Sequence, residues 1–178
     1  IYVERGKGSK LWDVDGNEYL DYCMGIGPIS LGYGYDKVDN AIKEQLEKGI
    51  TFSLMHRLEL EVAEKLHEII PNAESIRITK QGADACSAAV RIARAFTKRD
   101  KVAVCGYHGW HDWYIGTTTR DAGIPQAIKD LTVMIQYNNI ESVKAVMTPD
   151  LACLILEPII FEEPKDNFLH EVQALCQA

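Results

Sequence analysis

The chain has 178 residues, enough for one domain with a substantial core and for no more than two domains. Its formal net charge of −7 argues against a nucleic-acid partner, and no apolar run is long enough to span a membrane. We expect no signal peptide, because the first residues lead directly into structured-looking sequence. The five widely spaced cysteines predict reduced thiols in a cytoplasmic protein.

The first 35 residues predict a small β segment with local antiparallel structure. Strands are expected from Tyr2 onward, over residues 10–14 and over residues 18–22, and Asp15-Gly16-Asn17 is a strong turn signal. The glycine-rich residues 25–34 do not follow an apolar strand, so they are no phosphate-binding fingerprint. We interpret them as an irregular loop whose glycines permit close backbone approach to a ligand or partner.

Two amphipathic helices are predicted next. The first begins at Asp36, which can cap it, and ends before Gly49. The second covers about residues 58–70 and ends before Pro71. In both helices the apolar residues recur at the spacing that places them on one face.

From Glu74 onward strands and helices alternate, which predicts an α/β fold with a parallel, doubly wound sheet. The predicted strands are residues 74–80, 101–105, 132–137 and 151–156. The predicted helices run from after Asp84 to about Thr97, over about residues 140–147, and from near Asn167 to the end. The last strand is continuously apolar, which is typical of a strand buried on both faces. Because the sequence ends inside a crossover helix, we expect the N-terminal piece of a longer protein, with an incomplete large domain.

The turn at Gly82-Ala83-Asp84 is a candidate anion site. The first amides of a helix have no partners within the helix, and the helix dipole adds roughly half a positive charge there. A phosphate could be held at this turn without a lysine or arginine. The alternative interpretation is that Asp84 simply caps its own helix.

The polar loop after the strand at 101–105 has the sequence GYHGWHDW, which contains three aromatic residues and two histidines. It could be a stacking platform, with Tyr107 or Trp110 covering a flat ligand ring. It could also be a loop held in the core by its tryptophans. A metal site would use His108, His111 and Asp112. We expect no metal, because no further His/Cys cluster supplies the remaining ligands.

Glu157 ends the predicted buried strand at 151–156. In a parallel sheet, its carboxylate would face the same crevice as the turn at residue 82 and the loop at residue 106. A polar residue at a strand end also has purely structural uses. The spacing shows no Ser/His/Asp or Cys/His nucleophile arrangement.

Five segments together resemble the class III aminotransferases, which use pyridoxal 5′-phosphate, and most closely the branch that includes glutamate-1-semialdehyde aminomutase. Each segment alone is a weak signal, but all five occur in the family's order and at compatible spacing. They are GKGSKLWDVDGNEYLDY at 6–22, GPISLGYG at 27–34, QGADACSAAVRIARAFTKRDKV at 81–102, GYHGWHD at 106–112 and LILEPI at 154–159.

The resemblance implies a fold-type I transferase that forms a homodimer and moves an amino group from a small-molecule donor to a carbonyl acceptor, as an aminotransferase or as an aminomutase, which is an isomerase. Residues 1–35 would border the substrate site, and residues 36–178 would form the N-terminal part of the cofactor domain. Residues implied at the cofactor are Gln81, Gly82 and Ala83 for the phosphate, Tyr107 for the ring, His108 in the same loop, and Glu157 as a candidate catalytic residue.

The sequence departs from the family pattern in three respects. Ile26 stands about where the aminomutase branch has a tryptophan near its substrate. The usual Ser-Gly-Thr/Ser-Glu turn reads Gln81-Gly82-Ala83-Asp84, so phosphate binding would rest on amides or on neighbours such as Lys80. The lysine that forms the Schiff base is expected downstream of residue 178, so we expect this chain to be inactive alone. A metal-dependent hydrolase and a non-catalytic binding module are the alternatives.

Overall fold

The computed structural model describes residues 1–177, which divide into two compact units. The first unit is Ile1–Ile69, and the second begins at Ile70. No helix within the described residues is long and apolar enough to cross a membrane. The predicted domain boundary at residue 35 stays a prediction.

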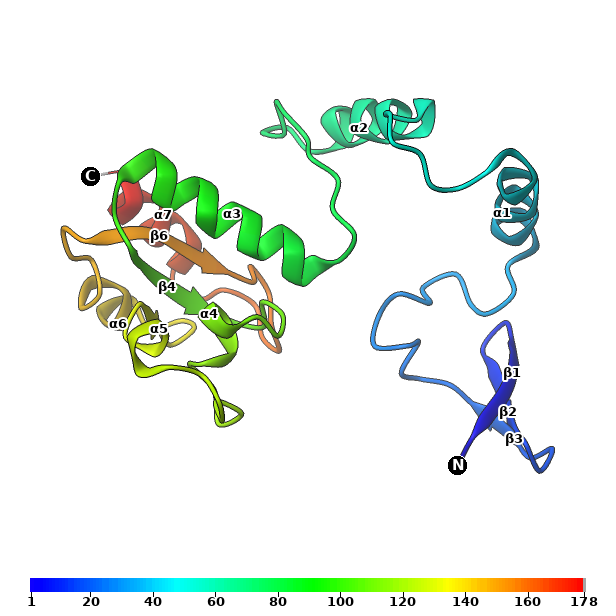
Figure 1. The fold of residues 1–178 in the computed structure, drawn as a ribbon. Coiled ribbons are helices and arrows are strands. Elements are labelled where there is room, and N and C mark those ends of the chain that lie inside the picture. Colours follow the sequence, from blue (N-terminus) through cyan, green and yellow to red (C-terminus); the bar gives the residue numbers. More distant parts are fainter. Residues whose placement is uncertain (178) are drawn as a thin grey trace. The chain divides into compact units, whose positions relative to one another are not determined.

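The first unit opens with an antiparallel meander of three short strands, β1 (Val3–Lys7), β2 (Lys10–Asp13) and β3 (Glu18–Leu20), as the sequence predicts (Figure 1). The turn between β2 and β3 is built on the Asp13 carboxylate, which is only 4% exposed. This carboxylate accepts hydrogen bonds from the amides of Asp15 and Asn17, from the Asn17 side chain and from the Tyr19 hydroxyl. These bonds lower the pKa of Asp13 from 3.8 to about 2, and the bond from the Asn17 side chain has the largest effect.

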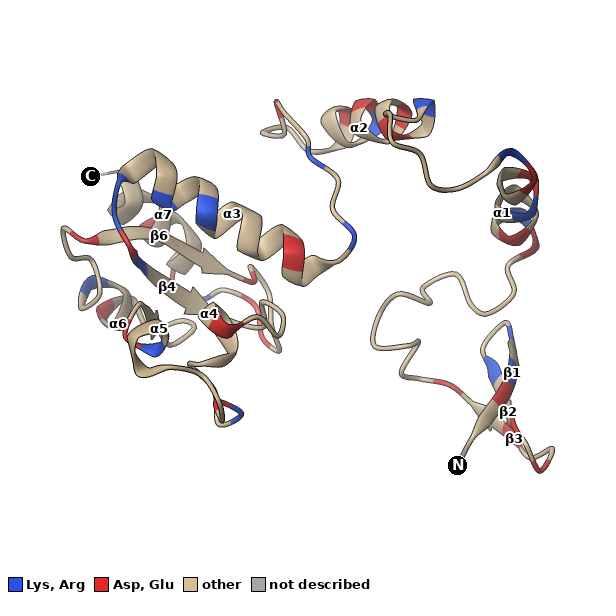
Figure 2. Cartoon of the chain, viewed as in Figure 1, with Lys and Arg blue, Asp and Glu red and all other residues tan. Residues whose placement is uncertain are grey.

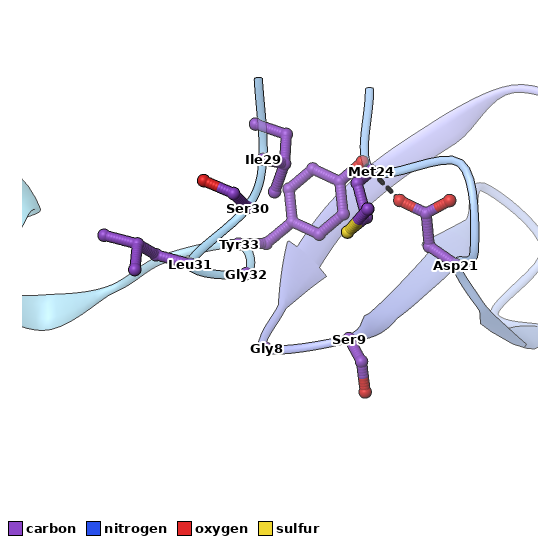
Figure 3. Close-up of a pocket in the computed structure, with 9 residues that line it drawn as sticks. All are labelled: Gly8, Ser9, Asp21, Met24, Ile29, Ser30, Leu31, Gly32 and Tyr33. Carbon is purple, nitrogen blue, oxygen red and sulfur yellow. Dashed lines mark hydrogen bonds between the residues drawn. The ribbon is translucent and has the colours of Figure 1, made fainter. Parts of the chain in front are cut away.

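The glycine-rich segment forms an irregular loop, as expected, and pairs with the meander through a bridge between Gly8 and Tyr33. A pocket of about 280 Å³ lies between them (Figure 3). On its wall the Tyr33 hydroxyl donates to Asp21 over 2.8 Å. The wall is completed by Ser9, Met24 and residues 29–32.

Two helices complete the first unit, α1 (Asp36–Lys48) and α2 (Arg57–Ile69), and neither has a buried residue. The prediction that Asp36 caps α1 is wrong, because Tyr35 is the cap residue and provides no side-chain hydrogen bond. The Asp36 carboxylate instead accepts from Lys7 Nζ over 2.8 Å, which draws it away from the helix amides. Gly49 ends α1 with a positive φ of 93°, as predicted.

The second unit is a three-stranded parallel sheet in the order β5-β4-β6, with β4 (Lys101–Cys105) between β5 (Thr132–Met134) and β6 (Leu151–Leu156). Side chains alternate along β4. Val102 and Val104 pack on one face with α3 (Gly82–Thr97) and α4 (Asp112–Ile115). Ala103 and Cys105 pack on the other face with α6 (Ile140–Lys144) and α7 (Phe168–Gln177). The sheet is therefore covered on both faces, as predicted; the short helix α5 (Gln126–Lys129) follows α4 (Figure 1).

The strand predicted at residues 74–80 is not formed. A strand exists through hydrogen bonds to a neighbouring strand. Within the part of the chain that the structure describes, no strand pairs with this segment, and Ile78 is 45% exposed. The alternation of Ile76 and Ile78 indicates a strand, but pairing decides whether one forms.

Candidate functional site

The loop after β4 is attached to the end of β6. The two strands are parallel neighbours, so their carboxyl ends lie at the same edge of the sheet. The amide of Glu157 donates to Cys105 O over 3.1 Å, and Glu157 Oε2 accepts from the amide of Tyr107 over 2.8 Å. Glu157 therefore fixes the position of Tyr107 through the backbone.

Gly106 makes this attachment possible. Its φ is +90°, and a side chain there would overlap the Glu157 carboxylate. The Tyr114 hydroxyl donates to Gly106 O over 2.8 Å. Burial, and secondarily the charge of Glu157, raises the pKa of Tyr114, which keeps this hydroxyl protonated as a donor.

The start of α3 leaves its first amides open. Gln81 is the cap residue without a side-chain cap, and the first helix-type bond runs from Ala85 N to Gln81 O. Among residues 1–177, the amides of Gly82, Ala83 and Asp84 have no acceptor. Asp84 does not cap the helix, because its Oδ1 accepts from the Gln81 side chain at 3.4 Å instead. An added Cβ at Gly82 would meet no atom within 4 Å, so the turn is open.

The two predicted ligand-binding segments meet at Gly109 and Ala83. Gly109 has φ +102°, and a Cβ on it would lie 2.5 Å from Ala83 Cβ. Only a glycine lets the loop approach the helix this closely. The open amides of α3 and the loop that carries Tyr107 therefore lie together at the carboxyl edge of the sheet.

The aromatic residues of the loop divide between solvent and core. Tyr107 is 66% exposed and meets the ring of Tyr114 edge-on at 5.8 Å. Trp110 is also mostly exposed, whereas Trp113 packs against the core cluster of α3 and β4. The loop is thus held in the core by Trp113 and Tyr114, while Tyr107 and Trp110 stay exposed.

The candidate metal ligands are not brought together. His108 is 4% exposed, and its Nε2 donates to Cys105 O over 2.9 Å, so its side chain is buried and bonded to the end of β4. His111 contacts α3, and Asp112 begins α4. Within residues 1–177 there is no group of three His, Cys, Asp or Glu side chains that could hold a metal ion.

One polar cluster is missed by the sequence reasoning. Ser87 Oγ lies 2.6 Å from His111 Nδ1 and accepts from Trp113 Nε1 over 2.8 Å. His111 Nε2 lies 3.7 Å from Asp84 Oδ1. The available signal was the spacing of Asp84 and Ser87, three residues apart on one face of α3, opposite a loop rich in histidine.

The comparisons place this chain in a known family. The model of the family "Aminotransferase class-III" matches residues 1–178. The chain is 37% identical to 3-aminobutyryl-CoA aminotransferase of Cloacimonas acidaminovorans, over 99% of this chain and 44% of that protein. It is 38% identical to glutamate-1-semialdehyde 2,1-aminomutase of Archaeoglobus fulgidus, over 97% of this chain and 45% of that protein.

Solved structures agree with this assignment. An omega-transaminase from Sphaerobacter thermophilus superimposes with a TM-score of 0.91 at 26% identity, covering 99% of this chain and 46% of that one. A structure described as a transaminase with PLP bound gives the same TM-score at 27% identity and the same coverage. This chain spans less than half the length of the relatives that it matches. It belongs to the class-III aminotransferase family.

Proposed function

We propose that the whole protein containing this chain is a pyridoxal-phosphate-dependent aminotransferase or aminomutase that acts on a carbonyl or semialdehyde substrate. The family and the names of its relatives support this class of reaction. The observation that carries the proposal for this chain is the contact of Gly109 with Ala83, which joins an open helix N-terminus to an exposed aromatic ring.

The residues present fit a phosphorylated flat ring. The amides of Gly82 and Ala83 have no acceptor in the described chain, and the turn at Gly82 is free of side chains. An anion there completes the hydrogen bonding of the helix and is favoured by its dipole. The exposed ring of Tyr107 offers a stacking face within the same edge of the sheet. Lost side-chain hydroxyls in the turn therefore do not remove the means of binding phosphate.

When bound, the cofactor supplies the electron sink for amino-group transfer. The chain's own residues bind and orient it. Gly82 and Ala83 donate amides to the phosphate, Gln81 borders the turn, and Tyr107 covers the ring and excludes water from that face. The Glu157 carboxylate accepts a hydrogen bond from the amide of Tyr107, so the first role of Glu157 is to position the loop. His108 shapes the same loop from the core. We expect the lysine that exchanges protons with the substrate to lie outside these 178 residues.

We also propose that the whole protein is a cytoplasmic homodimer. The five cysteines form no disulfide among the described residues, which suits a reducing compartment. The apolar faces of α1 and α2 are not buried within this chain. Such faces need a cover, either from the rest of the protein or from a second copy.

The test is a cofactor and activity assay on the whole protein. We expect the purified protein to bind pyridoxal 5′-phosphate stoichiometrically and to transfer or shift an amino group. Glutamate-1-semialdehyde and 3-aminobutyryl-CoA are the first substrates to try, because the relatives are named for them. A protein that retains no cofactor but contains stoichiometric zinc would contradict the proposal and favour the metal-dependent hydrolase.

A further inference from the structure

A chain of four side chains connects the start of α3 with the loop after β4. Trp113 Nε1 donates to Ser87 Oγ over 2.8 Å, and Ser87 Oγ lies 2.6 Å from His111 Nδ1. On its other side, His111 Nε2 lies 3.7 Å from Asp84 Oδ1. This series of contacts therefore ends at the Asp84 carboxylate, which follows the open amides of Gly82 and Ala83.

Ser87 can bond either tautomer of His111. An indole N–H can only donate, so Ser87 Oγ accepts from Trp113, and its second lone pair or its own proton can bond His111 Nδ1. When Nδ1 accepts, the ring proton is on Nε2 and faces Asp84. The distance of 3.7 Å between Nε2 and Asp84 Oδ1 makes that contact electrostatic rather than a hydrogen bond.

Asp84 poses a problem for a phosphate site. It stands in the first turn of α3, immediately after the two amides that would hold the phosphate. Its negative charge repels a phosphate bound there. Within α3 the arginines stand in the later turns (Figure 2), and Lys80 lies just before the helix. A contact that turns the Asp84 carboxylate toward the loop would lessen the repulsion.

We propose that His111 is a positioning residue that draws the Asp84 carboxylate toward the loop after β4 and away from the phosphate-binding amides. Ser87 and Trp113 fix the orientation of its ring, and the Gln81 side chain contacts the same carboxylate oxygen at 3.4 Å. This inference rests on the proposed function, because it concerns how α3 would bind the cofactor phosphate.

The same residues do not form a hydrolytic triad. The Ser87 oxygen is engaged by the indole of Trp113, and Ser87 is half-buried within α3. The separation of 3.7 Å between His111 and Asp84 is longer than the hydrogen bond that orients a catalytic histidine. A positioning role accounts for all four side chains, whereas nucleophilic catalysis does not explain why Trp113 donates to the Ser87 oxygen.

The test compares two ligands in the whole protein stripped of cofactor: pyridoxal 5′-phosphate, and pyridoxal, which lacks the phosphate. Their dissociation constants are measured by fluorescence titration. His111→Ala should weaken pyridoxal-phosphate binding about tenfold, the size of a charge interaction near a protein surface, and pyridoxal binding less than about twofold. A loss confined to the phosphorylated ligand separates this role from general loosening of the loop.

Removing the charge of Asp84 should rescue the variant. The double variant His111→Ala/Asp84→Asn should bind pyridoxal 5′-phosphate within about threefold of the parent protein, because the repulsion is gone. His111→Gln, which keeps an N–H donor, should also stay within about threefold. The rescue is informative even if His111→Ala alone lowers the thermal stability.

His170→Ala is the matched control, since His170 is exposed on α7 and should change neither affinity. Equal losses for both ligands in His111→Ala, or a double variant that binds no better than the single one, would overturn the inference. A parent protein that binds neither ligand would overturn the proposed function itself, so the two failures are distinguishable.

Discussion

The two units of this chain are stabilised in different ways. Among the described residues, every buried apolar side chain lies in the second unit, mainly on β4, β6 and the helices that cover them. The first unit buries a single residue, the carboxylate of Asp13. Its helices expose their apolar faces, with Val38, Ile42 and Leu46 each about half exposed. The second unit therefore carries its own core and the candidate site, whereas the first unit relies on local hydrogen bonds and leaves the apolar faces of its helices exposed.

The largest effect should come from a charge in the core of the second unit. Val104→Asp places an unpaired carboxylate at a fully buried position of β4, and we expect it to reduce the free energy of unfolding by about 4 kcal/mol or more. Chemical denaturation of the 178-residue chain measures this. The matched change Val38→Asp, on the half-exposed face of α1, should reduce it by less than about 0.5 kcal/mol. Similar losses from both variants would break the comparison.

The next effect concerns the contact that joins the loop to α3. Gly109→Ala forces a side chain into a positive φ and against Ala83, and we expect a loss of about 2–3 kcal/mol in stability together with weaker cofactor binding. Gly123→Ala is the control, because Gly123 also has a positive φ but an added Cβ would meet no atom within 4 Å. The difference between the two variants isolates the contact. Equal behaviour would mean that the loop does not need its close approach to Ala83.

A smaller effect should follow from the exposed aromatic ring. Tyr107→Ala in the whole protein should weaken pyridoxal-phosphate binding about tenfold, because stacking of the ring is worth roughly 1 kcal/mol or more. Stability should hardly change, since the ring is 66% exposed. Trp110→Ala, in the same loop and similarly exposed, serves as the comparison. If cofactor affinity falls only in the Trp110 variant, the ring assignment belongs to that residue instead.

The most local effect should appear in the turn of the first unit as the pH is lowered. The folded-state pKa of Asp13, at about 2, lies below its ordinary value of 3.8. A lowered pKa adds stability above the ordinary value, and that contribution disappears as the pH falls from about 4 through about 2. The amide signals of Asp15 and Asn17 in NMR spectra should report this loss of stability. In Asp13→Asn the pH-dependent change of these signals should be smaller. A turn that keeps its amide signals unchanged through pH 2 would contradict this account.

Most elements of the second unit were predictable because the signal is local. The apolar runs at 102–105 and 151–156 and the small residues that follow Asp84 all give the observed elements. Residues 74–80 alternate between apolar and polar side chains as a strand does, but no described strand pairs with them. The N-terminal cap of α1 was also misjudged, since Lys7 draws Asp36 away from the start of the helix. In each case a partner distant in sequence decided the outcome.

The candidate site divides in the same way. Family resemblance and helix chemistry indicate Gly82, Ala83 and Tyr107, and the structure places the turn and the loop at one sheet edge through Gly109. The sequence does not indicate that His108 turns into the core or that Glu157 bonds to the amide of Tyr107. Nor does it reveal the cluster of Ser87, His111 and Trp113. These depend on side-chain directions at positions that only packing brings together.

The sequence by itself therefore determined the family, most of the strands and longer helices and the presence of an unpartnered helix N-terminus, because motifs, hydrophobic periodicity and open amides are properties of neighbouring residues. Only the tertiary structure decided which histidine faces the core, which faces α3 and where the charge of Asp84 is directed. Those outcomes depend on the parallel pairing of β4 with β6 and on the close approach of Gly109 to Ala83, which join residues 26 or more positions apart.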